Sequence, residues 1–188
     1  MDEPLFSATN PNLPADAQIP APPVGIAEAG EPLPPVSPDR LPGSVAWLGY
    51  GGLAPFLALA AGAVGAGMHA DLCRAALFSY AAVILSFVGA LHWGIALTAP
   101  HMDARQRAGL YGWSVVPALL AWPALLVYAE PATFILIGGF IAHYWQDLRL
   151  VRKTAAQRLL PDWYLPLRLQ LTVVACICIA AGGLGGAR

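Results

Sequence analysis

The chain has 188 residues, of which only 11% are charged while 57% are hydrophobic. Soluble domains carry about 25% charged residues. This composition, with a mean hydropathy of +0.60, is therefore that of an integral membrane protein. The net charge of −1, without a basic run or a zinc-finger spacing, excludes a nucleic-acid partner.

Residues 1–42 form a first block that holds most of the 18 prolines. Proline lacks an amide donor and fixes φ, so we expect a Pro-rich non-regular tail that is extended or disordered. Residues 1–38 contain no Lys or Arg, and prolines interrupt every apolar run, so we expect no targeting signal there. Such a tail is suited to lying on a partner protein.

Residues 43–186 are predicted to form an all-α transmembrane domain, a polytopic bundle of five helices in contact with the lipid bilayer. Spanning the hydrocarbon core takes about 20 residues, and five apolar segments approach that length. Pro55 and the glycines at 49, 51 and 52 predict a kink or broken turns in the first helix. The predicted helices are 44–67, 75–99, 109–129, 131–149 and 165–184.

The connections between these helices set the topology. We expect an ordinary polar turn at His69–Arg74, a basic loop at Pro100–Arg107 and a tight turn at Glu130–Pro131. With five passes, the positive-inside rule places the N-terminus in the cytoplasm and the C-terminus in the periplasm of a bacterial inner membrane. Eight of the ten cations then lie inside, namely Arg40, Arg105, Arg107, Arg149, Arg152, Lys153, Arg158 and Arg168.

Several polar side chains fall at membrane depth, where each is costly. His92 and His143 lie near the inner ends of two helices that run inward, and Asp147 follows His143 at i+4 on the same helix face. Ser114 and Arg168 lie near the inner starts of the next helices. We therefore expect these five side chains to form one polar cluster near the inner leaflet.

Four interpretations of this cluster remain open. It can be structural, fixing helix order through interhelical hydrogen bonds, with Trp93, Trp113 and Trp145 as an interfacial belt. It can be a pocket for a quinone or a lipid head group, with the histidines as hydrogen-bond donors. It can hold haem b between His92 and His143, with Asp147 orienting His143. It can also relay protons, because histidine titrates near neutrality.

Small residues recur at helical spacing along the segment 75–99 and allow close helix contact in lipid. Ser79, Ser86 and Gly89 belong to this stripe, and Gly139 on the fourth helix is expected to contact it. The second helix is therefore predicted to be central. No nucleophile or metal motif appears, and Cys176 and Cys178 lie inside an apolar segment, so we expect no enzymatic activity and no metal other than a haem iron.

Four motifs resemble the transmembrane protein 69 family of small polytopic proteins from bacteria and mitochondria. They are WLGYGGLAPF at 47–56, VILSFVGALHWG at 83–94, WSVVPALLAW at 113–122 and DWYLPLRLQLT at 162–172. The resemblance covers about residues 41–184 and implies about five helices in an energy-transducing membrane, without supplying an activity. Carried over by position, the marked residues are Gly49, Pro55, Ser86, His92, Trp93, Gly94, Trp113, Pro117, Tyr164 and Arg168.

Two functions follow from these patterns. The first is a non-catalytic accessory or assembly subunit of a larger respiratory or photosynthetic membrane complex, which fits the small-residue helix faces, the partner-suited tail and the missing catalytic motifs. The alternative is a redox protein that binds quinone or haem through His92 and His143. A carrier is a third, weaker option, because no inverted repeat is visible.

Overall fold

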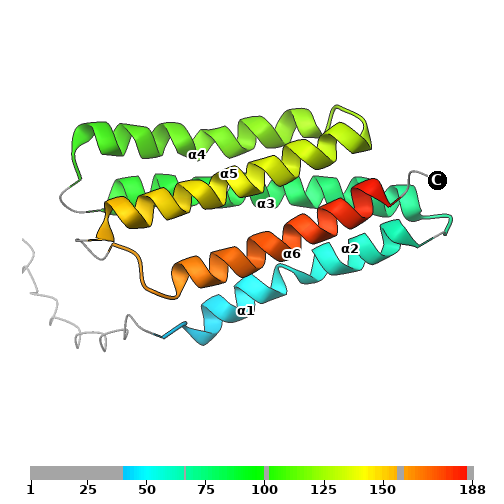
Figure 1. The fold of residues 1–188 in the computed structure, drawn as a ribbon, viewed down its shortest axis with the longest axis horizontal. Coiled ribbons are helices and arrows are strands. Elements are labelled where there is room, and N and C mark those ends of the chain that lie inside the picture. Colours follow the sequence, from blue (N-terminus) through cyan, green and yellow to red (C-terminus); the bar gives the residue numbers. More distant parts are fainter. Residues whose placement is uncertain (1–39, 66, 100–101, 156–158, 186–188) are drawn as a thin grey trace, which may run out of the picture. The chain divides into compact units, whose positions relative to one another are not determined.

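The computed structural model describes residues 40–185 except 66, 100–101 and 156–158 (Figure 1). The expected tail, residues 1–42, lies outside the described residues except for its last three, which are not helical. The described chain is helical and contains no strand. Its helices are α1 Gly43–Gly51, α2 Ala54–Val64, α3 Ala70–Thr98, α4 Ala104–Ala124, α5 Ala129–Lys153 and α6 Tyr164–Leu184.

The first predicted helix is broken, as its sequence led us to expect. Gly52 and Leu53 separate α1 from α2, and Pro55 occupies the first turn of α2, where its missing amide hydrogen is tolerated. The Tyr80 hydroxyl of α3 donates a hydrogen bond of 2.9 Å to the Gly52 carbonyl. A neighbouring helix thus covers the break, which is the condition for tolerating one at membrane depth.

Three of the predicted connections are helical in whole or in part, so those loop predictions were wrong for the helical residues. α3 begins at Ala70, and its first-turn Asp71 is bound by Arg74 at 2.6 Å. α4 begins at Ala104, capped by the Asp103 carboxylate, which accepts from the Gln106 amide. Acidic side chains near a helix N-terminus stabilise it through its dipole and free amides, so these polar stretches start helices rather than interrupt them.

The end of α4 and the beginning of α5 also differ from the prediction. Glu130 and Pro131 lie in the first turn of α5 instead of a tight turn, and α4 ends at Ala124, before the predicted position 129. α5 continues to Lys153, past position 149. Its last turn carries Arg152 and Lys153, cations that favour the negative end of the helix dipole.

Three helical stretches of the described chain are long and apolar enough to cross a membrane. They are the broken pair Gly43–Val64, the long helix Ala70–Thr98 and the last helix Tyr164–Leu184. α4 and α5 have 21 and 25 residues, which is sufficient length, but their sequences are less apolar overall than those three stretches.

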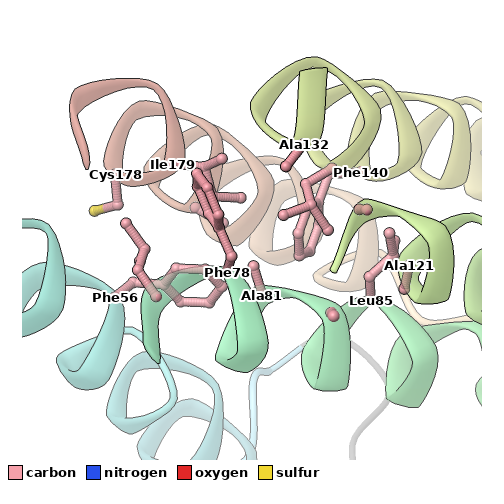
Figure 2. Close-up of a cluster of buried hydrophobic side chains, with 14 of the residues drawn as sticks. Phe56, Phe78, Ala81, Leu85, Ala121, Ala132, Phe140, Cys178 and Ile179 are labelled. Atoms are coloured by element: carbon pink, nitrogen blue, oxygen red, sulfur yellow. The ribbon is translucent and has the colours of Figure 1, made fainter. Parts of the chain in front are cut away.

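α3 is the central helix, as predicted, because it contacts α2, α4, α5 and α6. Figure 2 shows apolar side chains from these helices meeting beside it, among them Phe56 of α2, Phe140 of α5 and Ile179 of α6. Leu85 of α3 is fully buried in the same cluster. This core fixes the rotation of each helix about its axis and therefore decides which polar side chains meet.

Two of the predicted packing glycines lie at close helix contacts. A Cβ added to Gly89 would stand 2.9 Å from both the Ser114 carbonyl oxygen and the Pro117 ring of α4. One added to Gly139 of α5 would stand 2.6 Å from Leu85. The serines of the stripe behave differently, since the hydroxyls of Ser79 and Ser86 bond to carbonyls four residues earlier in α3.

Candidate functional site

The buried histidine, aspartate and arginine side chains gather at one end of the helices. α3 and α5 run in the same direction and end there, while α4 and α6 begin there (Figure 1). His92 lies in the last third of α3, and Asp147 in the last third of α5. Arg168 lies in the second turn of α6. Alternating helix direction thus brings together residues that are up to 76 positions apart in sequence.

The carboxylate of Asp147 is the centre of the site, and it is fully buried. Its Oδ2 accepts a hydrogen bond of 3.0 Å from Arg168 Nε, which also neutralises its charge. Its Oδ1 accepts a hydrogen bond of 3.2 Å from the Tyr164 hydroxyl. An uncompensated charge here would be very unfavourable, so the pair with Arg168 is what permits a carboxylate at this depth.

Both histidines face the same carboxylate oxygen. The Nε2 atoms of His92 and His143 lie 3.6 and 3.9 Å from Asp147 Oδ1, and both rings are fully buried. These distances exceed a hydrogen bond. Both nitrogens of His92 and Nε2 of His143 have no hydrogen-bond partner in the described chain. We call His92, His143, Asp147, Tyr164 and Arg168 the carboxylate cluster.

Trp113 of α4 fixes the tautomer of His143. Its indole Nε1 donates to His143 Nδ1 at 3.3 Å, and the planes of the two rings are 15° apart. An indole N–H can only donate, so Nδ1 must be an acceptor, and in a neutral ring the hydrogen is then on Nε2. His143 therefore presents a donor toward Asp147.

This arrangement fits neither haem nor a metal ion ligated by both histidines. The rings of His92 and His143 contact each other edge to face, with centroids 4.9 Å apart, and leave no space for a porphyrin between them. Ligand atoms of His92, His143 and Asp147 do lie within 4.8 Å of one another. Ligation through Nε2 of His143 would require its hydrogen to leave, however, and the bond from Trp113 places that hydrogen there.

Two of the expected site residues lie apart from the cluster. The Ser114 hydroxyl donates to the Tyr111 carbonyl of its own helix at 2.7 Å. Trp93 is half exposed and packs against Tyr111, with ring centroids 4.8 Å apart. Trp93 therefore has the position expected of an interfacial belt residue. Trp113, which was also expected in the belt, instead points its indole N–H inward to His143.

Tyr164 and Trp113 are the members of the network that sequence reasoning did not place in it. Tyr164 precedes Arg168 by four residues, and this i,i+4 spacing puts both on one face of α6. That spacing was a usable signal. The family resemblance singled out Trp113 as well, but no spacing in the chain placed it at the cluster, because its contact with His143 depends on how α4 is rotated against α5.

An apolar groove adjoins the cluster. It has a volume of about 320 Å³ and is lined by α1, α2, α3, α5 and α6, with Val88 and Leu91 of α3 and Leu171 of α6 among its walls. Tyr164 and Arg168 line it as well. The two residues that hold the Asp147 carboxylate thus also face a space suited to an apolar chain.

Comparisons with known proteins agree with the resemblance seen in the motifs. The family model described as "Protein of unknown function (DUF3429)" matches residues 41–184. Transmembrane protein 69 of Xenopus tropicalis is 36% identical over 133 residues, which cover 69% of this chain and 49% of the relative. The chain thus spans about half the length of that relative. No solved structure matches. With its apolar helices, the chain is a multi-pass membrane protein that belongs to the transmembrane protein 69 family.

Proposed function

We propose that this protein is a non-catalytic accessory or assembly subunit of a larger complex in a bacterial inner membrane. The observation that carries the proposal is that the polar side chains of the cluster are closed off from the surface of the protein. The most reactive side chains, His92, His143 and Asp147, are fully buried and face one another. A cluster that joins α3, α5 and α6, with Trp113 of α4 bonded to His143, stabilises one helix arrangement, and the outward surface is left for lipid and other membrane helices.

A photo-crosslinking amino acid tests for the partner. It is introduced at Phe87 of α3 or Phe134 of α5, which are both more than half exposed, and at Leu136 of α5, which is fully buried, as the matched control. We expect a crosslink to a second protein from at least one exposed position and none from Leu136. Mild extraction and native gels should show the same larger species. Lipid adducts alone, together with migration only as a monomer, would contradict the proposal.

The proposal includes five passes with the N-terminus in the cytoplasm. Cation placement supports it, because Arg105, Arg149 and Lys153 lie at the end of the helices that carries the carboxylate cluster, while Arg74 lies at the opposite end. Cytoplasmic connections carry such an excess of cations. α4 and α5 would then cross the bilayer despite their lower hydropathy, with Trp113, His143 and Asp147 turned inward to the cluster.

Cysteine labelling distinguishes five passes from three. In a chain whose three native cysteines are replaced by alanine, a single cysteine is placed at an exposed connection and treated with a membrane-impermeant maleimide. Met68→Cys, between α2 and α3, should react from the periplasm, and Asp103→Cys only after permeabilisation. Tyr128→Cys, between α4 and α5, is decisive, because five passes place it outside and three place it inside. Protection of Tyr128→Cys in intact cells would refute five passes.

A second candidate, quinone binding, is favoured by the apolar groove. A neutral quinone suits it because Arg168 is already paired with Asp147, so the groove offers hydrogen-bond donors without a free charge. The donors that line the groove include the Trp163 indole and the Arg168 nitrogens that Asp147 does not use, rather than the two histidines expected from the sequence, while the hydroxyl hydrogen of Tyr164 is already donated to Asp147. Filling the groove with Leu91→Trp should abolish co-purification of quinone, whereas Leu97→Trp, on the exposed side of α3, should not. Equal quinone content in both variants would exclude this candidate.

A further inference from the structure

A second pocket lies between the first turns of α4 and the last turns of α5. It has a volume of about 390 Å³. Three cations line it, Arg105 of α4 and Arg149 and Lys153 of α5, and no acidic residue does. The other lining side chains include Met102, Leu110 and Leu150. We call this the basic pocket.

The charge of the basic pocket is uncompensated. In the described chain, neither Arg105, Arg149 nor Lys153 forms an ion pair with an acidic side chain. The nearest acids in sequence are Asp103, which accepts from the Gln106 amide as the cap of α4, and Asp147, which is fully buried and paired with Arg168; neither lines the pocket. Three like charges around one hollow repel one another, so an anion bound there would relieve that repulsion.

The floor of the pocket, formed by its buried residues, is largely apolar. Its buried polar residue, Thr154, already donates its hydroxyl to the Leu150 carbonyl. Leu110 and Leu150 are nearly fully buried and pack with Ala96 of α3 in a separate small core. A free inorganic anion gains nothing from such a floor. An amphiphile with an anionic head and an apolar body matches both parts of the pocket.

The aromatic residue beside the pocket marks the level of the membrane surface. Trp145 is half exposed on α5, and the Arg149 guanidinium lies 5.5 Å from its ring centroid. Tryptophan prefers the boundary between hydrocarbon and head groups. The cations one and two turns further along α5 then stand at the depth of lipid phosphates.

We propose that the basic pocket binds the head group of an anionic phospholipid, with its acyl chains lying along α4 and α5. This site is separate from the carboxylate cluster; it rests on the proposed crossing of the bilayer by α4 and α5, but not on whether the protein belongs to a larger complex. In this position the anionic head group contacts cations of both α4 and α5, at the end of the helices where both carry charge. It thereby favours a bilayer position for the two least apolar helices.

The test uses the full chain in detergent with added lipid and native mass spectrometry. The wild-type chain should retain phosphatidylglycerol and not phosphatidylcholine. The double variant Arg105→Gln/Lys153→Gln should bind phosphatidylglycerol about thirtyfold more weakly, because each cation near the surface contributes about fivefold. All these positions are exposed, so the fold should persist, and circular dichroism checks that it does.

The matched control is Arg40→Gln/Arg152→Gln, which removes the same charge from exposed positions outside the pocket. Its affinity should stay within about threefold of the wild type, since these cations do not line the site. Equal loss in both double variants would mean that only net charge matters and would overturn the proposal. Equal binding of the two lipids would overturn it as well. So would complete displacement of the lipid by inorganic phosphate, because the pocket would then bind a soluble anion.

Discussion

The two ends of the helices are held together by different means. At the end that carries the carboxylate cluster, one buried carboxylate is approached by side chains of α3, α5 and α6. At the opposite end, helices approach through glycine. Leu77 of α3 contacts Gly182 of α6, Thr133 of α5 contacts Gly183, and a Cβ added to Gly62 of α2 would stand 2.6 Å from Cys73 Sγ.

This difference shows two solutions to one problem. Apolar side chains drive helices together only weakly in lipid, because the lipid tails are equally apolar. Close backbone contact and interhelical polar bonds are the two remaining sources of specificity. At the glycine end, specificity comes from close backbone packing, which leaves little room for an added side chain. At the cluster end, specificity comes from the buried ion pair of Asp147 and Arg168, which is destabilising if either partner is removed.

The largest effect is expected from Asp147→Asn, which keeps the shape of the cluster but removes its charge. Arg168, which is only 8% exposed, would be left without its partner. Removing one member of a buried pair costs about 3–5 kcal/mol of the free energy of unfolding. Unfolding by SDS in mixed micelles measures it.

The double variant Asp147→Leu/Arg168→Met serves as the control for that prediction. Replacing both partners leaves no unpaired charge, so it should retain more stability than Asp147→Asn alone. If the double variant is the less stable of the two, the ion pair is not the main contribution of these residues.

Gly89→Ala should have the next largest effect, because the new methyl group would meet a backbone carbonyl and a proline ring, neither of which can rotate away. Overpacking of this kind lowers the free energy of unfolding by about 1–3 kcal/mol. Gly94→Ala on the same helix has nothing within 4 Å and should stabilise by about 0.5–1 kcal/mol. A similar outcome for both variants would show that α3 and α4 are not in close contact.

Gly139→Ala should be milder than Gly89→Ala, although the new methyl group would come nearer to its neighbour. The group it meets at 2.6 Å is a terminal methyl of Leu85, which can move by a change of rotamer. We expect a loss of about 1 kcal/mol, the lower end of overpacking. Gly138→Ala, where nothing lies within 4 Å, is the control. A larger loss than for Gly89→Ala would mean that Leu85 is rigidly held.

Trp113→Phe should have the smallest effect on stability. It removes the hydrogen bond to His143 Nδ1, and interhelical hydrogen bonds in membranes average about 0.6 kcal/mol. The tautomer is the sharper readout, because ¹⁵N NMR of His143 should show loss of the single Nε2–H form. Trp122→Phe, at an exposed position of α4, should change neither quantity. An unchanged tautomer in Trp113→Phe would exclude the assigned role of Trp113.

Sequence reasoning succeeded where a signal was local or depended only on helix direction. The break near Pro55 followed from its own residues, and the gathering of His92, His143, Asp147 and Arg168 followed from counting depth along antiparallel helices. It failed at Asp71, Asp103 and Glu130, where polar residues were read as loops although they begin helices.

What the sequence by itself determined is the membrane class, the helical content and the end of the helices at which polar residues collect. These properties depend on hydropathy and chain order alone. Only the tertiary structure decided that Trp113 donates to His143, that Tyr164 and Arg168 share one carboxylate, and that a groove and a basic pocket lie nearby. The physical reason is helix rotation, which sets the atoms that meet and is fixed by close contacts such as Gly89 with Pro117 and Gly139 with Leu85.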